Sequence, residues 1–179
     1  PLAWSSAASD VYKRQGSGGG HFSKADEITP ENVKKLERVW VHRSGDYKGG
    51  ANSAGVKGGE YQTSFQATPL LVDDTLFYCT SYNRVFALDP ETGKEKWVFD
   101  PKLKKDGRAI LACRGLSSWK DETKSSSEKC HHRIMGVTID AELFSIDGKS
   151  GEICNDFGNN GRVNLREGLG EHPALYLSL

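Results

Sequence analysis

The chain has 179 residues, with 24 Lys and Arg against 24 Asp and Glu, 36% hydrophobic residues and 20 Gly. This composition is typical of a single globular domain. Because the charge is balanced, no basic surplus is present to neutralise a phosphate backbone, and nucleic-acid binding is not expected. No stretch approaches the about 18 consecutive apolar residues of a membrane-spanning helix.

The two ends of the chain differ from the rest. Residues 1–15 begin without Met and contain SSAASDVYKRQ, which resembles a transposase sequencing adapter translated in frame. They lack the basic and apolar regions of a signal peptide. Residues 177–179, Leu-Ser-Leu, are similar to the start of the opposite adapter. We therefore expect residues 1–15 and 177–179 to be adapter-derived and residues 16–176 to be native, clipped from a longer protein.

The first predicted element is a short helix over residues 28–36. Thr29 can cap it, Pro30 suits its first position, and Ile28 can pack on Val33.

Beyond the helix the hydrophobic period changes to two. Runs rich in β-branched and aromatic residues predict strands at residues 39–42, 68–72, 75–80, 84–88 and 96–99. Two polar stretches, residues 46–64 and 102–129, are predicted to be solvated segments rather than domain linkers, because strands of the same kind follow each. The chain is therefore predicted to be all-β.

A turn motif occurs twice. Asp89 can accept hydrogen bonds from the amides that follow it, and Gly93 can take a left-handed conformation that returns the chain. Trp97 then offers a flat group to pack between neighbouring sheets. Asp147 and Gly151 repeat the pattern 58 residues later, without a tryptophan in the matching place. Because propeller blades have a period of roughly 40 to 50 residues, we interpret this repeat as two four-stranded blades carrying an insertion.

Several short motifs, in their order along the chain, resemble those of the pyrroloquinoline quinone (PQQ)-dependent dehydrogenases. The stretches that carry the resemblance are ITPENV (28–33), WVHRSGD (40–46), QATPL (66–70), FDP (99–101), CRG (113–115), TIDA (138–141) and CNDFG (154–158). FDPKLK before a single Cys-Arg-Gly is most similar to the membrane-bound glucose and quinate dehydrogenases. The soluble alcohol dehydrogenases of the family have two adjacent cysteines there, and this chain has none.

The resemblance implies a fold and an activity. The fold is an eight-bladed β-propeller of which residues 16–176 are the first blades. The full-length enzyme oxidises a hydroxyl of a sugar or polyol and passes electrons through PQQ to membrane ubiquinone. It is expected in the periplasm, anchored by a segment that precedes the propeller. The resemblance also implies that calcium ligands and catalytic residues come from later blades, so that this fragment is inactive alone.

Three positions match cofactor contacts of the family. Gln66 matches a polar side chain that contacts the quinone; the alternative is a strand-end amide bonded to the backbone. Arg114 matches an arginine that meets the cofactor's oxygens, and its fork of donors suits a planar ligand with several carboxylates. The alternative for Arg114 is an ordinary surface arginine. Thr138 matches a hydroxyl contact, or is an ordinary β-branched strand residue.

The four cysteines allow three fully paired connectivities, and an oxidising compartment would permit bridges. We expect a Cys113–Cys130 disulfide, because it would tether the polar stretch 102–129. Cys79 lies in an apolar strand and is expected to be a buried thiol. Cys130-His131-His132 has metal-ligand residue types without the spacing of a zinc site, and no metal site is assigned. The Gly-rich run at residues 16–20 lacks the context of a phosphate loop.

Two other functions fit the repeat. A non-enzymatic propeller, similar to the outer-membrane assembly lipoproteins, would use the same turn motif as a protein-binding scaffold. It would not need Cys113-Arg114-Gly115 with Gln66 upstream. A propeller that binds sugar without redox chemistry would differ from the enzyme only in residues outside this chain.

Overall fold

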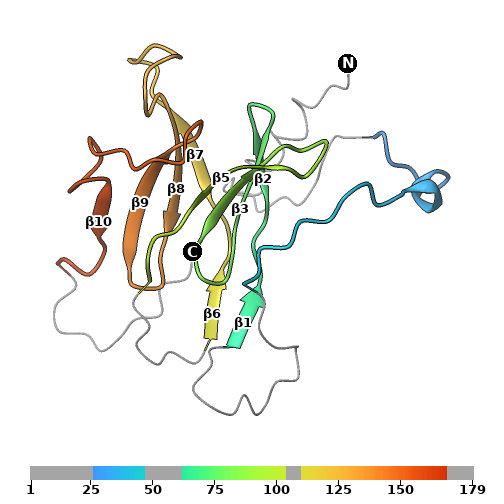
Figure 1. Ribbon diagram of the computed structural model, residues 1–179, viewed down its shortest axis with the longest axis horizontal. Coiled ribbons are helices and arrows are strands. Elements are labelled where there is room, and N and C mark those ends of the chain that lie inside the picture. The colour runs from blue at the N-terminus through green and yellow to red at the C-terminus, as the bar shows by residue number, and fades with distance from the viewer. Residues whose placement is uncertain (1–25, 47–61, 104–109, 169–179) are drawn as a thin grey trace.

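The computed structural model of the chain describes residues 26–46, 62–103 and 110–168 (Figure 1). The two adapter-like ends, the Gly-rich run 16–20 and most of the polar stretch 46–64 lie outside the described residues. No helix in the part that is described is long and apolar enough to cross a membrane.

The first sheet confirms four of the predicted strands. It is antiparallel, in the order β2-β3-β4-β5. Its strands are β2 (Leu70–Val72), β3 (Thr75–Cys79), β4 (Val85–Leu88) and β5 (Glu95–Phe99). The fifth predicted strand, residues 39–42, does not form, because this segment has no strand partner among the described residues.

The second sheet is built in the same way. Its order is β10-β9-β8-β7, and all neighbours are antiparallel. Its strands are β7 (Ser117–Lys120), β8 (His132–Val137), β9 (Glu142–Asp147) and β10 (Arg162–Asn164). Two four-stranded units therefore follow one another, as the repeat predicted.

The stretch 102–129 is not a continuous loop as predicted. It contains β6 (Ile110–Cys113), which pairs with β1 (Gln62–Phe65), and it contains β7. The sequence of β7, Ser-Ser-Trp-Lys, lacks a strand pattern, and its strand conformation comes from its hydrogen bonds to β8. Pairing with a distant neighbour thus outweighs local propensity here.

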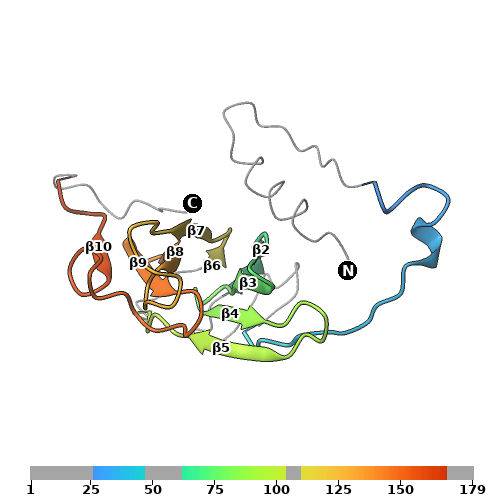
Figure 2. The ribbon, with the colours of Figure 1, turned by 90° about the horizontal axis from the view of Figure 1, so that it is seen from above.

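A common core lies between the two sheets, which face one another in Figure 2. Phe99 of the first sheet packs on Phe144 of the second, with ring centroids 5.1 Å apart. Alternation along β3 and β4 places Phe77, Cys79, Val85 and Ala87 on this face. The intervening residues Tyr78, Phe86 and Leu88 form a second cluster on the opposite face of the first sheet. The first sheet is therefore apolar on both sides.

The predicted helix is shorter than expected. Residues 30–32 form a turn, and only Val33–Lys35 is helical, as a single 3-10 turn. The Thr29 carbonyl accepts the amides of Asn32 and Val33, but the residue that precedes the helical turn is Asn32, so the predicted cap at Thr29 is wrong. Ile28 and Val33 both remain exposed, so the expected apolar packing between them buries neither side chain.

The repeated turn has the predicted geometry in both copies. Asp89 Oδ1 accepts the amides of Glu91 and Thr92, at 3.1 and 2.8 Å. Asp147 Oδ1 accepts the equivalent amides of the second copy at 3.0 and 2.8 Å. Gly93 and Gly151 both take the left-handed conformation, with φ of 70° and 72°.

Each of these turns receives a tryptophan from a different element. Trp97 of β5 lies on Gly151 of the second sheet, so closely that a Cβ there would meet the indole at 2.6 Å. The Trp97 indole also donates to the Gly148 carbonyl at 3.3 Å. Trp97 therefore packs between the sheets, as predicted. Trp40 covers Gly93 in the same manner.

The predicted Cys113–Cys130 disulfide is wrong. The disulfides are Cys79–Cys113 and Cys130–Cys154, with Cα atoms 5.9 and 5.8 Å apart. Cys79 is consequently not a free thiol. The physical reason lies in the strands. Cys113 ends β6, which pairs with β1, whereas Cys130 lies just before β8 of the second sheet. Cys113 and Cys130 therefore belong to different units.

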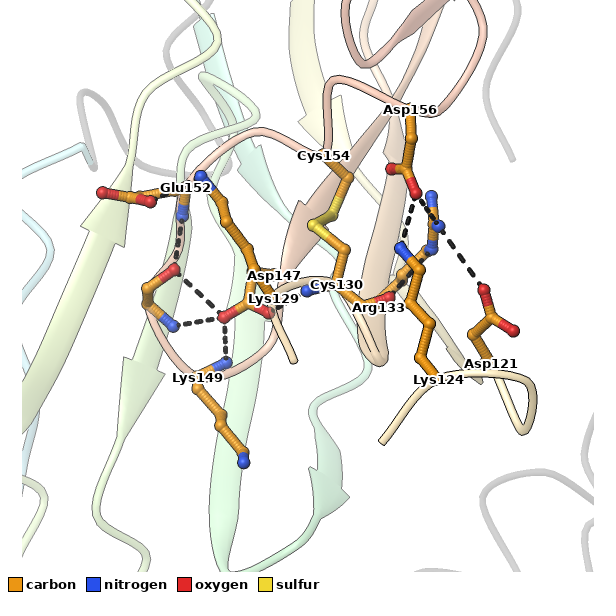
Figure 3. The surroundings of a disulfide bond; sticks show 11 residues. Asp121, Lys124, Lys129, Cys130, Arg133, Asp147, Lys149, Glu152, Cys154 and Asp156 are labelled. Carbon is orange, nitrogen blue, oxygen red and sulfur yellow. Dashed lines mark hydrogen bonds and ion pairs between the residues drawn. A yellow bond between two sulfur atoms is a disulfide. The ribbon is translucent and has the colours of Figure 1, made fainter. Parts of the chain in front are cut away.

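The polar segment before Cys130 is anchored by charge as well as by its disulfide (Figure 3). Arg133 is buried and donates to Asp156 at 2.8 Å, and Lys124 binds the same carboxylate at 2.6 Å. The hydrogen bond from Lys124, followed by those from Arg133, holds the pKa of Asp156 below its usual range. These contacts give the Cys130 region a structural role.

Candidate functional site

A parallel pair of strands brings two of the three predicted cofactor residues together. β1 and β6 run side by side in Figure 1, with Ser64 opposite Ala112 and Phe65 opposite Cys113. Gln66 and Arg114 are the next residue on each strand. Because parallel strands end at the same edge, two residues that are 48 positions apart in the sequence meet at one strand end.

Both of these side chains are exposed at that edge. The Gln66 amide nitrogen donates to Ser64 Oγ at 2.9 Å, which leaves its carbonyl oxygen directed away from that bond. The backbone beyond the strands is tied as well, because the Thr68 amide donates to the Arg114 carbonyl at 2.9 Å. The backbone that carries the guanidinium of Arg114 is thus hydrogen-bonded to the segment that follows β1.

Thr138 is placed differently. It follows β8, is 1% exposed, and its hydroxyl accepts the amide of Glu142 at 3.2 Å. Its backbone amide donates to the Glu142 carbonyl at 2.8 Å, so Thr138 closes the turn between β8 and β9. Its side chain therefore serves its own turn in this structure, whereas Gln66 and Arg114 face outward.

A residue that the sequence analysis did not single out links the two places. Asn83 lies in the turn between β3 and β4, is 2% exposed, and has φ of 54°. Its side chain accepts the Ile139 amide at 3.0 Å and donates to the Ala112 carbonyl at 3.4 Å. The sequence signal was an Asn between two apolar strands, which is typical of a left-handed turn but equally of any hairpin.

An ion pair lies next to this turn. Arg84 donates through Nε and Nη2 to both oxygens of Asp46, each at 2.8 Å. These hydrogen bonds raise the pKa of Arg84. A hollow of about 440 Å³ adjoins the pair and is also lined by Tyr82, Asp100 and Lys102. Burial raises the pKa of Asp100, but the amide and ammonium of Lys102 lower it on balance, so this carboxyl is charged at neutral pH.

The exposed donors at the β1–β6 edge fit an anionic, planar ligand. Arg114 offers a rigid fork of N–H donors, which matches carboxylate and quinone oxygens. Gln66 adds one amide whose oxygen and nitrogen can each meet a polar ring atom. The arrangement can bind and orient such a ligand.

A second, larger hollow lies elsewhere. It measures about 720 Å³ and lies over the face of the first sheet that is turned away from the second sheet. Its lining includes Trp40, Val41, Phe65 and Tyr78. Because this lining is mainly apolar and contains neither Gln66 nor Arg114, it is a different feature from the strand-end site.

The chain matches one protein-family model. Residues 10–178 match the model described as "Glucose/ethanol/alcohol dehydrogenase, beta-propeller domain", a PQQ family.

Two named dehydrogenases are identical to the chain at about a third of the aligned positions. The chain is 36% identical over 161 residues to quinoprotein glucose dehydrogenase A of Acinetobacter calcoaceticus, covering 83% of this chain and 19% of that protein. It is 34% identical over 172 residues to the quinate/shikimate dehydrogenase (quinone) of Acinetobacter baylyi, covering 87% and 20%. The chain thus spans about a fifth of the length of these relatives.

A solved structure has the same fold. The quinohemoprotein alcohol dehydrogenase from Comamonas testosteroni superposes with a TM-score of 0.59 at 22% identity, covering 88% of this chain and 19% of that one.

Proposed function

The chain belongs to the β-propeller family of PQQ-dependent glucose, ethanol and alcohol dehydrogenases, and from this membership we propose that it is part of a quinoprotein enzyme that oxidises a sugar or polyol. The relatives' names support the substrate class, since they include glucose, quinate and glycerol dehydrogenases. The observation that carries the proposal is the meeting of Gln66 and Arg114 at the β1–β6 edge.

We propose that residues 16–176 are early blades of a longer propeller. Two facts support this. The chain spans about a fifth of its relatives. The first sheet is apolar on the face turned away from the second sheet, where it keeps the hollow of about 720 Å³. Such a face is covered when another blade packs on it.

In this proposal PQQ, when bound, accepts the two electrons removed from the substrate hydroxyl. The residues of this chain hold and orient it. Arg114 pairs with oxygens of the cofactor and balances its negative charge, while Gln66 fixes the ring's orientation through one or two hydrogen bonds. Thr138 is buried and its hydroxyl already accepts the Glu142 amide, so it ranks as the weakest of the three candidates.

Further parts of the enzyme are proposals of the same kind. Calcium would be bound by residues of later blades, and ubiquinone would accept the electrons. The periplasm is the proposed location, with a membrane anchor before the propeller. Two disulfides support this location, because disulfides persist in oxidising compartments.

The test uses the complete protein of the same gene, titrated with PQQ and calcium while a dye is reduced with sugars or polyols. Arg114→Ala removes a charge-assisted pairing, so PQQ affinity is expected to fall about 10- to 100-fold. The measurement is the PQQ concentration that gives half-maximal dye reduction.

The matched control is Arg166→Ala, which removes another exposed arginine, located after β10. It should leave the PQQ titration unchanged. If the wild-type protein neither binds PQQ nor reduces dye with any polyol, the proposal is wrong, and a protein-binding scaffold becomes the better function.

A further inference from the structure

The turn between β3 and β4 contacts both strands that end at the candidate site. It comprises residues 79–83, from the last residue of β3 to Asn83, and is called here the 79–83 turn. Two backbone hydrogen bonds close it. The Asn83 amide donates to the Thr80 carbonyl at 2.8 Å, and the Thr80 amide donates to the Arg84 carbonyl at 2.9 Å. Cys79, Ser81 and Asn83 are all buried.

Two hydrogen bonds from this turn reach one register pair of the parallel strands. Ser81 Oγ donates to the Ser64 carbonyl of β1 at 3.0 Å. Asn83 Nδ2 donates to the Ala112 carbonyl of β6 at 3.4 Å. Ser64 and Ala112 are partners in the register, and each lies two residues before Gln66 or Arg114. One turn therefore holds both strands at the same level.

A covalent bond adds to this attachment. Cys79 forms the disulfide with Cys113, the residue immediately before Arg114. Because a disulfide fixes its two Cα atoms within a narrow range, here 5.9 Å, β6 cannot slide along the turn.

The same turn also reaches the third candidate. Asn83 Oδ1 accepts the amide of Ile139, which directly follows Thr138. The backbone beside Gln66, Arg114 and Thr138 is thus contacted by side chains of one five-residue segment, although the three residues come from distant parts of the chain.

We propose that the 79–83 turn sets the positions of the cofactor-binding residues, with Ser81 and Asn83 as positioning residues that do not touch the cofactor. This inference rests on the proposed function. Exposed side chains such as Gln66 and Arg114 bind tightly only if their backbone is ordered before the ligand arrives, because ordering it on binding costs affinity.

The experiment measures PQQ binding to the complete apoprotein, by quenching of its intrinsic fluorescence, and hydrogen exchange of the Thr68 amide without cofactor. Asn83→Gly removes both bonds but suits the positive φ. It is expected to weaken PQQ binding about tenfold and to speed exchange at Thr68. Ser81→Ala, a milder change, should weaken binding about threefold.

The matched control is Asn160→Gly. Asn160 has a φ of 50°, close to that of Asn83, but is exposed and bonds only locally to Asn159. It should leave binding and exchange unchanged. Equal losses in Asn83→Gly and Asn160→Gly would overturn the inference, as would unchanged PQQ binding in both turn variants, even with faster exchange.

Binding to the wild-type protein distinguishes the proposed function from the inference. If the wild type fails to bind PQQ, the proposed function falls and takes the inference with it. If the wild type and both turn variants bind PQQ equally tightly, the inference alone is overturned.

Discussion

The two Asp–Gly turns share the hydrogen bonds within the turn and a docked indole, yet their surroundings differ. Trp97, which covers Gly151, comes from a paired strand and also packs on Phe77, with centroids 5.6 Å apart. Trp40, which covers Gly93, comes from a segment without a strand partner among the described residues. Its neighbour Val39 is 83% exposed.

This difference separates local from tertiary causes. The local sequence is sufficient to build the turn and the flat surface over its glycine, because both copies have them. How firmly the tryptophan is held depends on the element that carries it. An indole on a paired strand is fixed between two sheets. The indole of Trp40, on an unpaired segment, is held by its hydrogen bond of 3.1 Å to the Pro90 carbonyl and by packing on the outer face of the first sheet.

The largest expected effect comes from adding a methyl group under each indole. Gly151→Ala forces a left-handed alanine and expels Trp97, so it should lower the free energy of unfolding by about 3 kcal/mol. Gly93→Ala should cost about 2 kcal/mol, because Trp40 can swing outward. The measurement is chemical unfolding of the complete protein, followed by tryptophan fluorescence.

The control for this series is Gly168→Ala. Gly168 has a φ of 82°, and no described residue has an atom within 4 Å of an added Cβ. It therefore carries the backbone strain alone, about 1 kcal/mol. Equal losses at Gly93 and Gly151 would show that the two indoles are held equally firmly.

A smaller effect is expected from acid. Burial raises the pKa of Asp147, but the amides of Cys130 and Ser150 lower it more, and the pKa of Asp89 is lowered chiefly by the hydrogen bond from the Thr92 side chain. Both folded-state values lie below 3.8. Their stabilisation is therefore complete above that pH and is lost as the pH falls through the folded pKa.

Asp147→Asn should make the thermal midpoint less dependent on pH in this range, and should cost about 1 to 2 kcal/mol at neutral pH. Asp89→Asn is the matched variant and should have the weaker effect, because Asp147 also accepts the Cys130 amide at 2.6 Å and Asp89 lies in an exposed turn. A steeper acid dependence in Asp147→Asn than in wild type would contradict this assignment.

The smallest effect concerns the face beside Trp40. Tyr78 lies there, with its hydroxyl 2.6 Å from His42 Nδ1, and burial, followed by the charges of Glu95 and Asp46, raises its pKa to about 12. On alkaline titration the phenolate absorbance of Tyr78 should thus develop last. The Tyr78→Phe variant identifies this signal, because it should lack the last part of the absorbance change. Any stability linked to this shift is present below pH 10.0 and declines toward 12.

The control for the titration is Tyr82→Phe, for a tyrosine beside the Arg84 ion pair. The last part of the absorbance change should remain in this variant. If Tyr78 instead titrates with the other tyrosines, the segment that carries Trp40 does not cover this face of the first sheet.

Much of the fold could be predicted from the sequence. Alternating apolar residues predicted the four strands of the first sheet, and the spacing of Asp89 and Gly93, repeated at Asp147 and Gly151, predicted a second unit of the same kind. These features are local, since a period of two and a glycine with positive φ are determined by neighbouring residues. The resemblance also selected Gln66 and Arg114, which the structure brings to one strand edge.

Other features depended on contacts between distant residues. β6 and β7 are strands because of their partners, and residues 39–42 are not a strand because they have no partner within the described part of the chain. The pairing of the cysteines followed from which strands lie together, which spacing along the chain does not specify. The sequence by itself determined the turns, the core strands and the family, whereas only the tertiary structure decided that the 79–83 turn holds both strands of the candidate site, because hydrogen bonds between distant residues leave no local pattern.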